Sequence, residues 1–406
     1  MLIIDEIDSR QTNNRTEAIA RITANGHEYR VWFRWKGAMC PTPADAYLAA
    51  GIQPAMCLGG KLIVKGSVSE RLLKNLPKIQ ETYLRRYPTL SPLNVEVDDV
   101  RPWNPKPDHL PAQAPRNVVC KRGTKTGLVG TLFSGGVDSF YSVLKHLDEI
   151  RSLVFIHGFD ISLNDQQLRK HVSESLRNAA SKLRKPLIEV ETNIRQFSDR
   201  YVAWNPYHPQ VLVAVGIILS GCLSKLHIPS SWSYSDLEYM ERLNIVINMD
   251  PATAPLFSTD RIEFAHDGCE STRIEKCKAI AENDVAMETL RVCWLNPGGA
   301  YNCGRCEKCL RTMVNLRIAG ALERCKTFNL SLNPKKVLAI AGKKNPYNMI
   351  IRQNIEMGER LGTDPELLSA LRLSLTRRIN IQPRWLLFQA YELALAARRH
   401  YYRKWT

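Results

Sequence analysis

LVGTLFSGGVDSFYSVLK, the stretch Leu128–Lys145, decides the fold. It begins with a short apolar run, continues through a pair of glycines, and then repeats apolar residues at helical spacing from Phe140 onward. This pattern predicts a strand, a tight loop and a helix. Further strand-like runs, separated by helical segments, occur at Leu153–His157, Pro186–Val190 and Leu226–Pro229. The alternation predicts an α/β fold with a doubly wound, mostly parallel sheet.

The loop between the first strand and its helix has the chemistry of a phosphate site. Two glycines let the backbone approach a ligand, and the N-terminus of the helix offers unpaired N–H groups and a partial positive charge. Asp138 could hydrogen-bond the loop or hold a Mg²⁺ that bridges phosphate oxygens. The alternative is a glycine-rich turn with a side chain capping the helix. We expect phosphate contacts from Ser134, Gly135, Gly136, Val137, Asp138 and Ser139.

Four cysteines follow the spacing of a metal site. Cys293, Cys303, Cys306 and Cys309 form C-x9-C-x2-C-x2-C, within which Gly304 suits a knuckle turn. This spacing predicts one structural Zn²⁺ per chain, held entirely by protein thiolates. Free thiols in a helix and an iron–sulfur cluster are the alternatives.

Together, the loop and the cysteines resemble a known family. SGGVDS resembles the loop of the PP-loop ATP pyrophosphatases, and a cysteine knuckle about 155 residues later is similar to that of 7-cyano-7-deazaguanine synthase. The resemblance covers about residues 116–320, roughly half the chain. It implies a sheet of the PP-loop (HUP) type, with ATP, Mg²⁺ and Zn²⁺ as cofactors.

The resemblance also implies an activity. Family members are ATP-dependent C–N ligases that release pyrophosphate and AMP: they adenylate 7-carboxy-7-deazaguanine and combine it with ammonia to give an amide and then a nitrile. Relatives in antiphage operons carry added domains, and some are thought to attach the deazapurine to a protein amine. Added segments at both ends make this chain similar to that antiviral defence branch. Residues 157–165 of this chain, HGFDISLND, differ from the family's glutamine-containing stretch. This departure weakens the expectation of the nitrile step more than that of adenylation.

Other residues have functional and structural interpretations side by side. Asp160, after the second predicted strand, could contact ribose or Mg²⁺, or cap a turn. Arg273 and Lys276 share a helix face and could neutralise leaving pyrophosphate, or form a solvated basic edge. We expect catalytic roles for Asp138, Ser139, Arg273 and Lys276. His208 is expected to cap a helix, and a serine-rich stretch from Ser230 could line a base pocket or form an ordinary loop.

Charge and proline content suggest three parts. Residues 1–115 predict a small α+β domain with a hairpin at Asn25-Gly26 and a helix over Val68–Tyr87. Six prolines in residues 91–117 predict an extended linker, with a boundary near Arg116. Residues 116–310 form the ATP-binding part. Residues 311–406 are helix-like and hold 18 Lys+Arg against 6 Asp+Glu, out of a formal net charge of +16 for the 406-residue chain.

Composition limits the function classes. With 44% hydrophobic and 24% charged residues the chain is globular. The longest apolar stretch, Val211–Leu223, has 13 residues, too few for a bilayer span of about 20, so we expect a buried helix, no membrane partner and a cytoplasmic protein.

Alternatives to a ligase remain open from the residues alone. The basic aromatic end, Arg372–Thr406, could bind nucleic acid or an acidic protein, or form a solvated helix. A tRNA-modifying enzyme using Cys222 or Cys269 as a sulfur carrier, and a non-catalytic ATP-binding scaffold, are the competing functions. A protein acceptor or a defence-operon partner is a further expectation from the resemblance.

Overall fold

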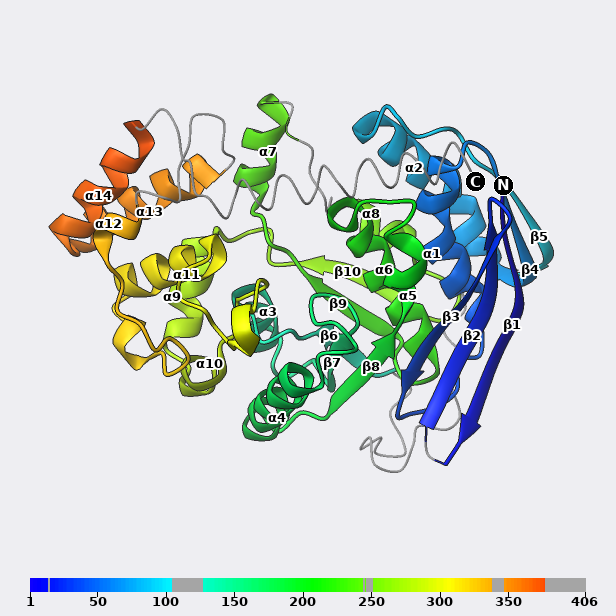
Figure 1. Ribbon diagram of the computed structural model, residues 1–406, viewed down its shortest axis with the longest axis horizontal. Helices are drawn as coiled ribbons and strands as arrows, with labels where there is room; N and C mark the ends of the chain where they lie inside the picture. Colours follow the sequence, from blue (N-terminus) through cyan, green and yellow to red (C-terminus); the bar gives the residue numbers. More distant parts are fainter. Residues whose placement is uncertain (14, 104–126, 244, 246–250, 338–346, 377–406) are drawn as a thin grey trace.

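The computed structural model describes residues 1–13, 15–103, 127–243, 245, 251–337 and 347–376, and in them one mixed sheet organises the fold (Figure 1). The sheet has 10 strands in the order β10-β9-β6-β7-β8-β3-β2-β1-β4-β5. The strands are β1 (Leu2–Thr12), β2 (Arg15–Ala24), β3 (His27–Trp35), β4 (Lys61–Ser69), β5 (Asn94–Arg101), β6 (Val129–Leu132), β7 (Ser152–His157), β8 (Leu187–Thr192), β9 (Lys225–Pro229) and β10 (Glu263–Asp267).

The parallel part of the sheet contains the strands that the alternating pattern predicts. β10, β9, β6, β7 and β8 pair in parallel, and β7 is buried along its whole length. The predicted α/β architecture with a mostly parallel sheet is confirmed. Parallel sheets need helices on both faces, which suits β7, whose residues 153–156 are continuously apolar.

The N-terminal strands add an antiparallel part. β2 and β3 form the predicted hairpin, in which Asn25 and Gly26 both have positive φ, as a tight two-residue turn requires. β1 pairs with β2 antiparallel and with β4 in parallel, and β5 follows β4. β5 lies in the stretch for which we predicted a linker, and that prediction is wrong for residues 94–101. The boundary near Arg116 lies outside the described residues.

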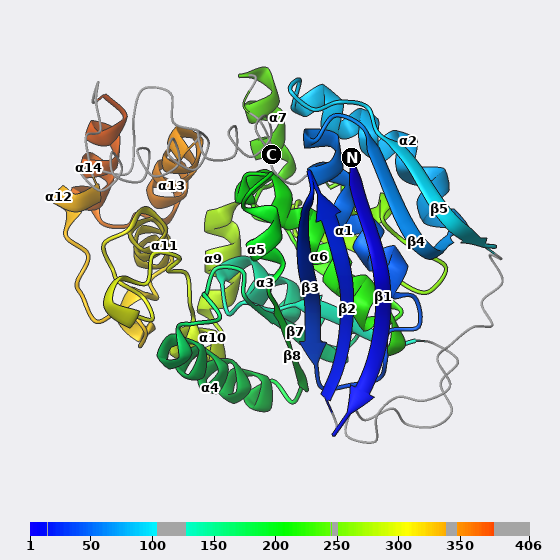
Figure 2. The ribbon, with the colours of Figure 1, turned by 45° about the vertical axis from the view of Figure 1, so that its right-hand side comes forward.

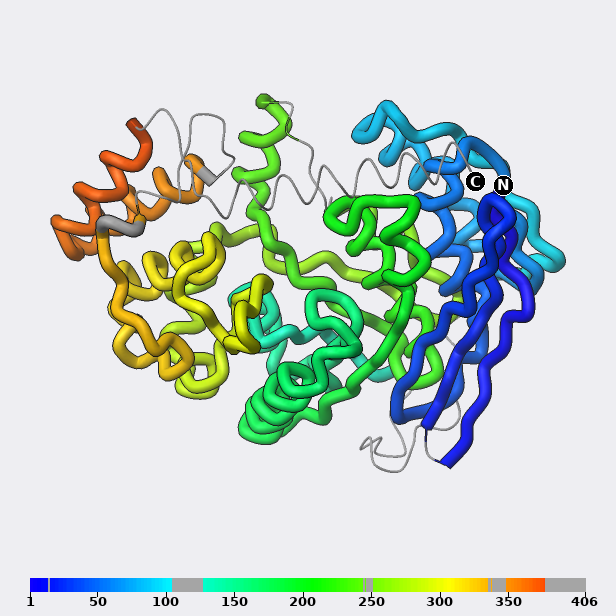
Figure 3. Tube along the Cα trace, viewed as in Figure 1, coloured from blue at the N-terminus to red at the C-terminus, as the bar shows by residue number. Residues whose placement is uncertain are grey.

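One strand pair joins the two parts. β3 pairs antiparallel with β8, with Phe33 opposite Thr192 and Trp35 opposite Val190. Just beyond β8, the Asn193 amide accepts from the Trp32 N–H and donates to the Arg30 carbonyl, each at 2.9 Å. The sheet is therefore continuous from the N-terminal strands into the parallel part, as the course of the chain in Figure 3 shows.

Helices cover the sheet in two groups, each with its own hydrophobic core. The first core joins one face of the sheet to α1, α2, α5, α6 and α8, and the second joins the other face to α3, α4, α9, α10, α11, α12, α13 and α14. Figure 2 shows β1–β3 with α1 and α6 behind them. The helices are α1 (Pro43–Cys57), α2 (Glu70–Arg86), α3 (Val137–Lys145), α4 (Gln166–Lys182), α5 (Ile194–Ser198), α6 (Trp204–Ile218), α7 (Tyr234–Arg242), α8 (Thr253–Leu256), α9 (Arg273–Ala281), α10 (Asp284–Thr289), α11 (Glu307–Ile318), α12 (Pro334–Val337), α13 (Tyr347–Leu361) and α14 (Pro365–Thr376).

Two helix predictions are confirmed. α2 matches the helix expected over Val68–Tyr87, and α6 with the following 3₁₀ turn Leu219–Gly221 occupies most of the apolar stretch 211–223. Among the described residues, no helix combines the length and the apolarity needed to cross a bilayer. Of the basic aromatic segment 372–406, only residues 372–376 at the end of α14 are described, so the interpretation of that segment stays a prediction.

A partly buried ion triad ties β5 to the parallel part of the sheet. Arg101, the last residue of β5, bonds the Asp45 carboxylate at 2.5 Å and the Asp260 carboxylate at 2.8 Å. Asp45 lies in α1 and is fully buried, and Asp260 precedes β10. The other Asp45 oxygen accepts from the Ser69 N–H at 2.7 Å. The ion pairs of Arg101 therefore connect β5 with α1 and with the segment before β10, which are far apart in the sequence.

Candidate functional site

The glycine loop lies beyond the carboxyl end of β6, in the middle of the parallel strands. Gly136 is the N-cap of α3, and Gly135 has φ +74°, a conformation that favours glycine. A Cβ on Gly135 would lie 2.8 Å from the Leu176 side chain. The Gly135 carbonyl accepts from the Arg291 N–H at 2.8 Å, which fixes the bend. Ligands of open α/β sheets bind at this edge, so the loop has the predicted position.

The two serines of the loop bond the loop itself. The Ser134 hydroxyl accepts from the Gly136 N–H at 3.4 Å, and the Ser139 hydroxyl donates to the Gly136 carbonyl at 2.9 Å. Val137 is fully buried, which leaves only its backbone to a ligand. In this conformation the serines shape the bend.

Asp138 is the centre of a buried group of charges. Its Oδ2 accepts from Arg273 Nη1 at 2.6 Å, and its Oδ1 is 3.9 Å from Lys276 Nζ. Lys276 Nζ also donates to the Ser230 carbonyl at 2.7 Å. Arg273 is 7% exposed and Lys276 1% exposed, so the alternative of a solvated basic edge is wrong. The first turn of α9 faces the first turn of α3.

Burial and the two cations act on the Asp138 pKa in opposite directions. Burial favours the neutral acid, but the charges of Arg273 and Lys276 outweigh it and lower the pKa below its ordinary value. Burial lowers the pKa of Lys276, which Asp138 only partly opposes. Asp138 is therefore ionised at neutral pH, and its charge balances only part of the cation charge around it.

A third buried cation comes from the helix after the cysteines. Arg311 in α11 is 7% exposed, its Nε lies 3.0 Å from Glu307 Oε1, and it is close enough to help lower the Asp138 pKa. We name Arg273, Lys276 and Arg311 the cation cluster. Sequence reasoning missed Arg311, although its place two residues after the last cysteine of the knuckle was a usable signal.

Residues on the far side of the loop complete its surroundings. Arg291, 6% exposed, donates to the Asn296 side chain at 3.2 Å, and burial lowers its pKa while the charge of the exposed Asp160 raises it. Asp160 likewise acts on His208, whose pKa burial lowers. His208 lies inside α6 rather than at its N-cap, so the cap prediction is wrong. Asp160 is thus near Arg291, the residue that holds the bend.

The serine-rich stretch divides between site and scaffold. The Ser231 hydroxyl donates to Asp138 Oδ2 at 3.4 Å, and the Ser230 carbonyl accepts from Lys276. Ser233 instead caps α7 in a capping box with Asp236, and the Tyr234 side chain points to solvent, with 62% of the residue exposed.

The cysteines predicted to hold a metal come together in space. The four sulfur atoms of Cys293, Cys303, Cys306 and Cys309 lie within 4.8 Å of one another. Backbone N–H groups donate to three of them: Asn296 to Cys293, Cys306 to Cys303 and Cys309 to Cys306, at 3.3–3.4 Å. Such N–H···S bonds stabilise thiolates, and Gly304 has the positive φ of a knuckle turn. Four converging sulfur donors fit a tetrahedral Zn²⁺.

We expect Cys306→Ser to lose the thiolate-bound zinc, because three sulfur donors hold the ion more weakly than four. Metal analysis by mass spectrometry should give one tightly bound zinc fewer per chain for Cys306→Ser than for the wild type. Cys325→Ser is the matched control, since Cys325 is equally buried nearby but outside the group. Iron in place of zinc, or equal zinc in both variants, would contradict the assignment.

The two other cysteines considered for sulfur chemistry are poorly placed for it. Cys222 is 4% exposed and Cys269 2% exposed. Burial raises the pKa of Cys269, which therefore stays a thiol at neutral pH. A sulfur carrier needs an accessible thiolate, so neither residue fits that role.

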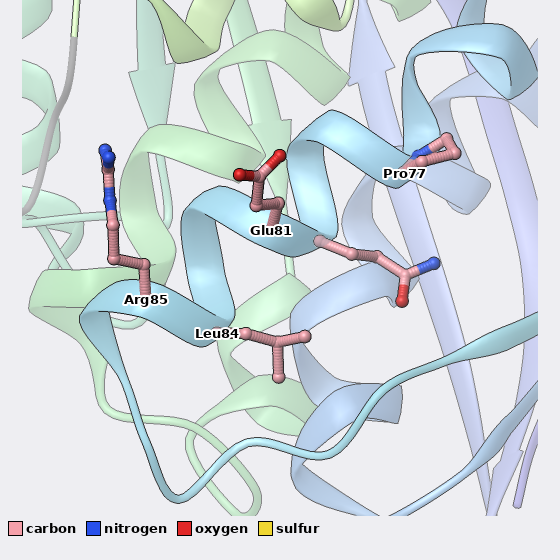
Figure 4. A pocket seen from close by; sticks show the side chains of 5 residues that line it. Pro77, Glu81, Leu84 and Arg85 are labelled. Carbon is pink, nitrogen blue, oxygen red and sulfur yellow. The ribbon is translucent and has the colours of Figure 1, made fainter.

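A shallow pocket on α2 is separate from this chemistry. It is lined by Pro77, Gln80, Glu81, Leu84 and Arg85, all from one helix (Figure 4). Its lining holds one acid and one base, both on the surface, and none of the loop, cation or cysteine residues.

The loop and the cation cluster together form the candidate functional site. A helix N-terminus, a glycine bend and three buried cations around the carboxylates of Asp138 and Glu307 favour an anion with several charges, such as a polyphosphate. The cysteine group supports this site, since α11 runs directly from Cys309 to Arg311. Comparison of the chain with protein-family models, with curated proteins and with solved structures finds no match.

Proposed function

We propose that this chain is an ATP-dependent C–N ligase that adenylates a carboxylate and releases pyrophosphate. The observation that carries the proposal is the cation cluster: Arg273, Lys276 and Arg311 are buried beside the N-terminus of α3. Asp138 faces Arg273 and Lys276, and Glu307 pairs with Arg311, so three cations share two carboxylates. Buried cations are costly unless an anion completes their neutralisation. The β and γ phosphates of ATP supply such an anion.

The reaction proceeds by two displacements. A carboxylate oxygen attacks the α phosphorus, a P–O bond to the α phosphorus forms, and the bond between that phosphorus and the bridging oxygen to the β phosphorus breaks. Pyrophosphate leaves with the bonding electrons. An amine nitrogen then attacks the acyl carbonyl, AMP leaves, and the amine loses a proton. No side-chain nucleophile is needed.

Each residue of the site has one role in this scheme. The loop N–H groups and the cation cluster stabilise the charge that develops on the leaving pyrophosphate, which is usually the largest contribution to catalysis. Asp138 orients Arg273 through their 2.6 Å hydrogen bond. Mg²⁺ bound to the phosphates would neutralise them further. Mg²⁺ could bind Asp138 through Oδ1, because this oxygen accepts no hydrogen bond within the described residues.

The resemblance of the loop and knuckle supports 7-carboxy-7-deazaguanine as the carboxylate. The acceptor is then ammonia, giving an amide or nitrile, or an amine on a partner protein in antiphage defence. Neither Cys222 nor Cys269 is suited to sulfur transfer, which favours nitrogen over sulfur as the nucleophile.

The direct test is pyrophosphate and AMP release by the purified chain with ATP, Mg²⁺, 7-carboxy-7-deazaguanine and ammonium. We expect release that depends on the deazapurine acid. Mass spectrometry of a candidate partner protein after the same incubation would detect a conjugate. Release that instead requires tRNA would favour a tRNA-modifying enzyme, and no release with any of these substrates would contradict the ligase.

A further inference from the structure

A second group of metal-binding side chains lies away from the cysteines, between α3 and the sheet. His146 is the C-cap of α3, His227 lies in the middle of β9, and Asp267 is the last residue of β10. One ligand atom of each lies within 4.8 Å of the other two. His146 Nε2 is 2.9 Å from Asp267 Oδ1, and the two imidazole rings stack with centroids 4.5 Å apart. We name these three residues the imidazole–carboxylate cluster.

His227 is the member of the cluster that the protein leaves unsatisfied. The residue is 4% exposed, and neither of its ring nitrogens has a hydrogen-bond partner within the described residues. Its nearest carboxylate, Glu149, lies 3.4 Å from Nε2 without hydrogen-bond geometry. A buried imidazole without a partner costs free energy that a bound ligand would recover.

Two donors hold the carboxylate of the cluster in place. Ser142 donates to Asp267 Oδ2, and Lys145 Nζ donates to Oδ1 at 2.8 Å. Lys145 also bonds Glu270 at 2.6 Å, so it keeps an acceptor when another cation takes Asp267 Oδ1.

We propose that His146, His227 and Asp267 bind one divalent transition-metal ion, with Zn²⁺ as the best fit. Two imidazoles and one carboxylate are ligands that Zn²⁺ prefers over Mg²⁺ or Ca²⁺. Donor atoms around a tetrahedral Zn²⁺ are about 3.4 Å apart. The ligand atoms of the three residues lie within 4.8 Å of one another, so small side-chain rotations would bring them to that spacing. Glu149 Oε2, 3.5 Å from His146 Nδ1 and 3.4 Å from His227 Nε2, lies outside the converging group and would orient the two imidazoles.

The site would fix the position of the loop from the opposite end of its helix. The glycine bend begins α3 and His146 ends it, while the other two ligands stand on neighbouring strands of the sheet. A metal there ties α3 to β9 and β10. This role is structural and is independent of the proposed ligase activity.

Equilibrium dialysis of the full chain against Co²⁺, which replaces zinc and has a visible spectrum, tests the proposal. We expect two metal equivalents per chain in the wild type: one with the sulfur charge-transfer band of the cysteine site, and one without it. His227→Gln and His146→Gln should each lose only the second equivalent. Glu149→Gln should bind it about tenfold more weakly.

His171→Gln is the matched control, because His171 is an exposed histidine on α4 outside the cluster, and it should keep both equivalents. His146 is the more exposed ligand, so its variant serves where His227→Gln fails to fold. A wild type that binds only the sulfur-ligated ion would overturn the proposal, as would a second equivalent that survives both histidine substitutions.

Discussion

Replacing Lys276 with methionine should lower the rate of pyrophosphate release by about 10²–10³-fold, or about 2.7–4 kcal/mol in the activation free energy. The ammonium is 1% exposed and points at the Asp138 carboxylate beside the loop. Charge stabilisation is strong in so buried a place, because little water screens it. Pyrophosphate release under saturating ATP, measured by a coupled assay, reports the loss.

Methionine keeps the length and apolar stem of Lys276, so the fold should persist. Asp138 retains its bond to Arg273, and the Ser230 carbonyl loses one donor, at a cost of about 1–3 kcal/mol in the free energy of unfolding. Lys278→Met is the matched control, since Lys278 is an exposed lysine two residues along α9. Equal rates for the two variants would remove Lys276 from the site.

Arg101→Ala should destabilise the chain by about 3–5 kcal/mol at pH 8, because it leaves the buried Asp45 carboxylate without its cation. The loss should depend on pH. Burial already raises the pKa of Asp45 above its ordinary value, and Arg101 opposes that rise. Without Arg101 the folded-state pKa of Asp45 rises further.

The sign of the pH dependence follows from that direction. A carboxyl group whose pKa is raised by folding contributes most favourably at low pH, and this contribution is lost as the pH rises through the folded-state pKa. The deficit of Arg101→Ala should therefore shrink between pH 8 and pH 5, as Asp45 takes up a proton. Asp260, whose pKa Arg101 lowers against the effect of burial, loses the same cation, so its pKa shifts upward in the variant as well.

Urea unfolding at both pH values measures the effect. Arg85→Ala is the control: Arg85 is exposed in the last turn of α2, and its loss should leave the urea midpoint unchanged at either pH. A deficit that is the same at pH 5 and pH 8 would show that Arg101 acts through packing rather than through its charge.

The strands and helices with strong local patterns could be predicted from the sequence. The hairpin at Asn25-Gly26, the helix α2 and the buried runs of β7 and β9 all carry their own signals. β5 was missed because prolines surround it and only Val95 and Val97 mark its buried side. The pairing of β3 with β8 could not be foreseen, because it joins segments over 150 residues apart and is fixed by Asn193 only in the folded chain.

The site shows the same division. The loop and the four cysteines are contiguous motifs whose chemistry can be predicted from spacing. Arg273 and Lys276 were chosen for their helix face, but their burial depends on α9 packing beside α3, which local sequence does not encode. The imidazole–carboxylate cluster left no motif at all, because its three members come from α3, β9 and β10.

The pairing of β3 with β8 has a consequence for solubility. Without the N-terminal strands, β8 would become an edge strand of the parallel sheet, and its unpaired N–H and C=O groups could pair with another extended chain. In the folded chain the β2–β3 hairpin pairs with this edge through β3. The parallel part of the sheet is thus protected from strand-to-strand aggregation by the segment that precedes it, and a fragment that begins after the hairpin would lack that protection.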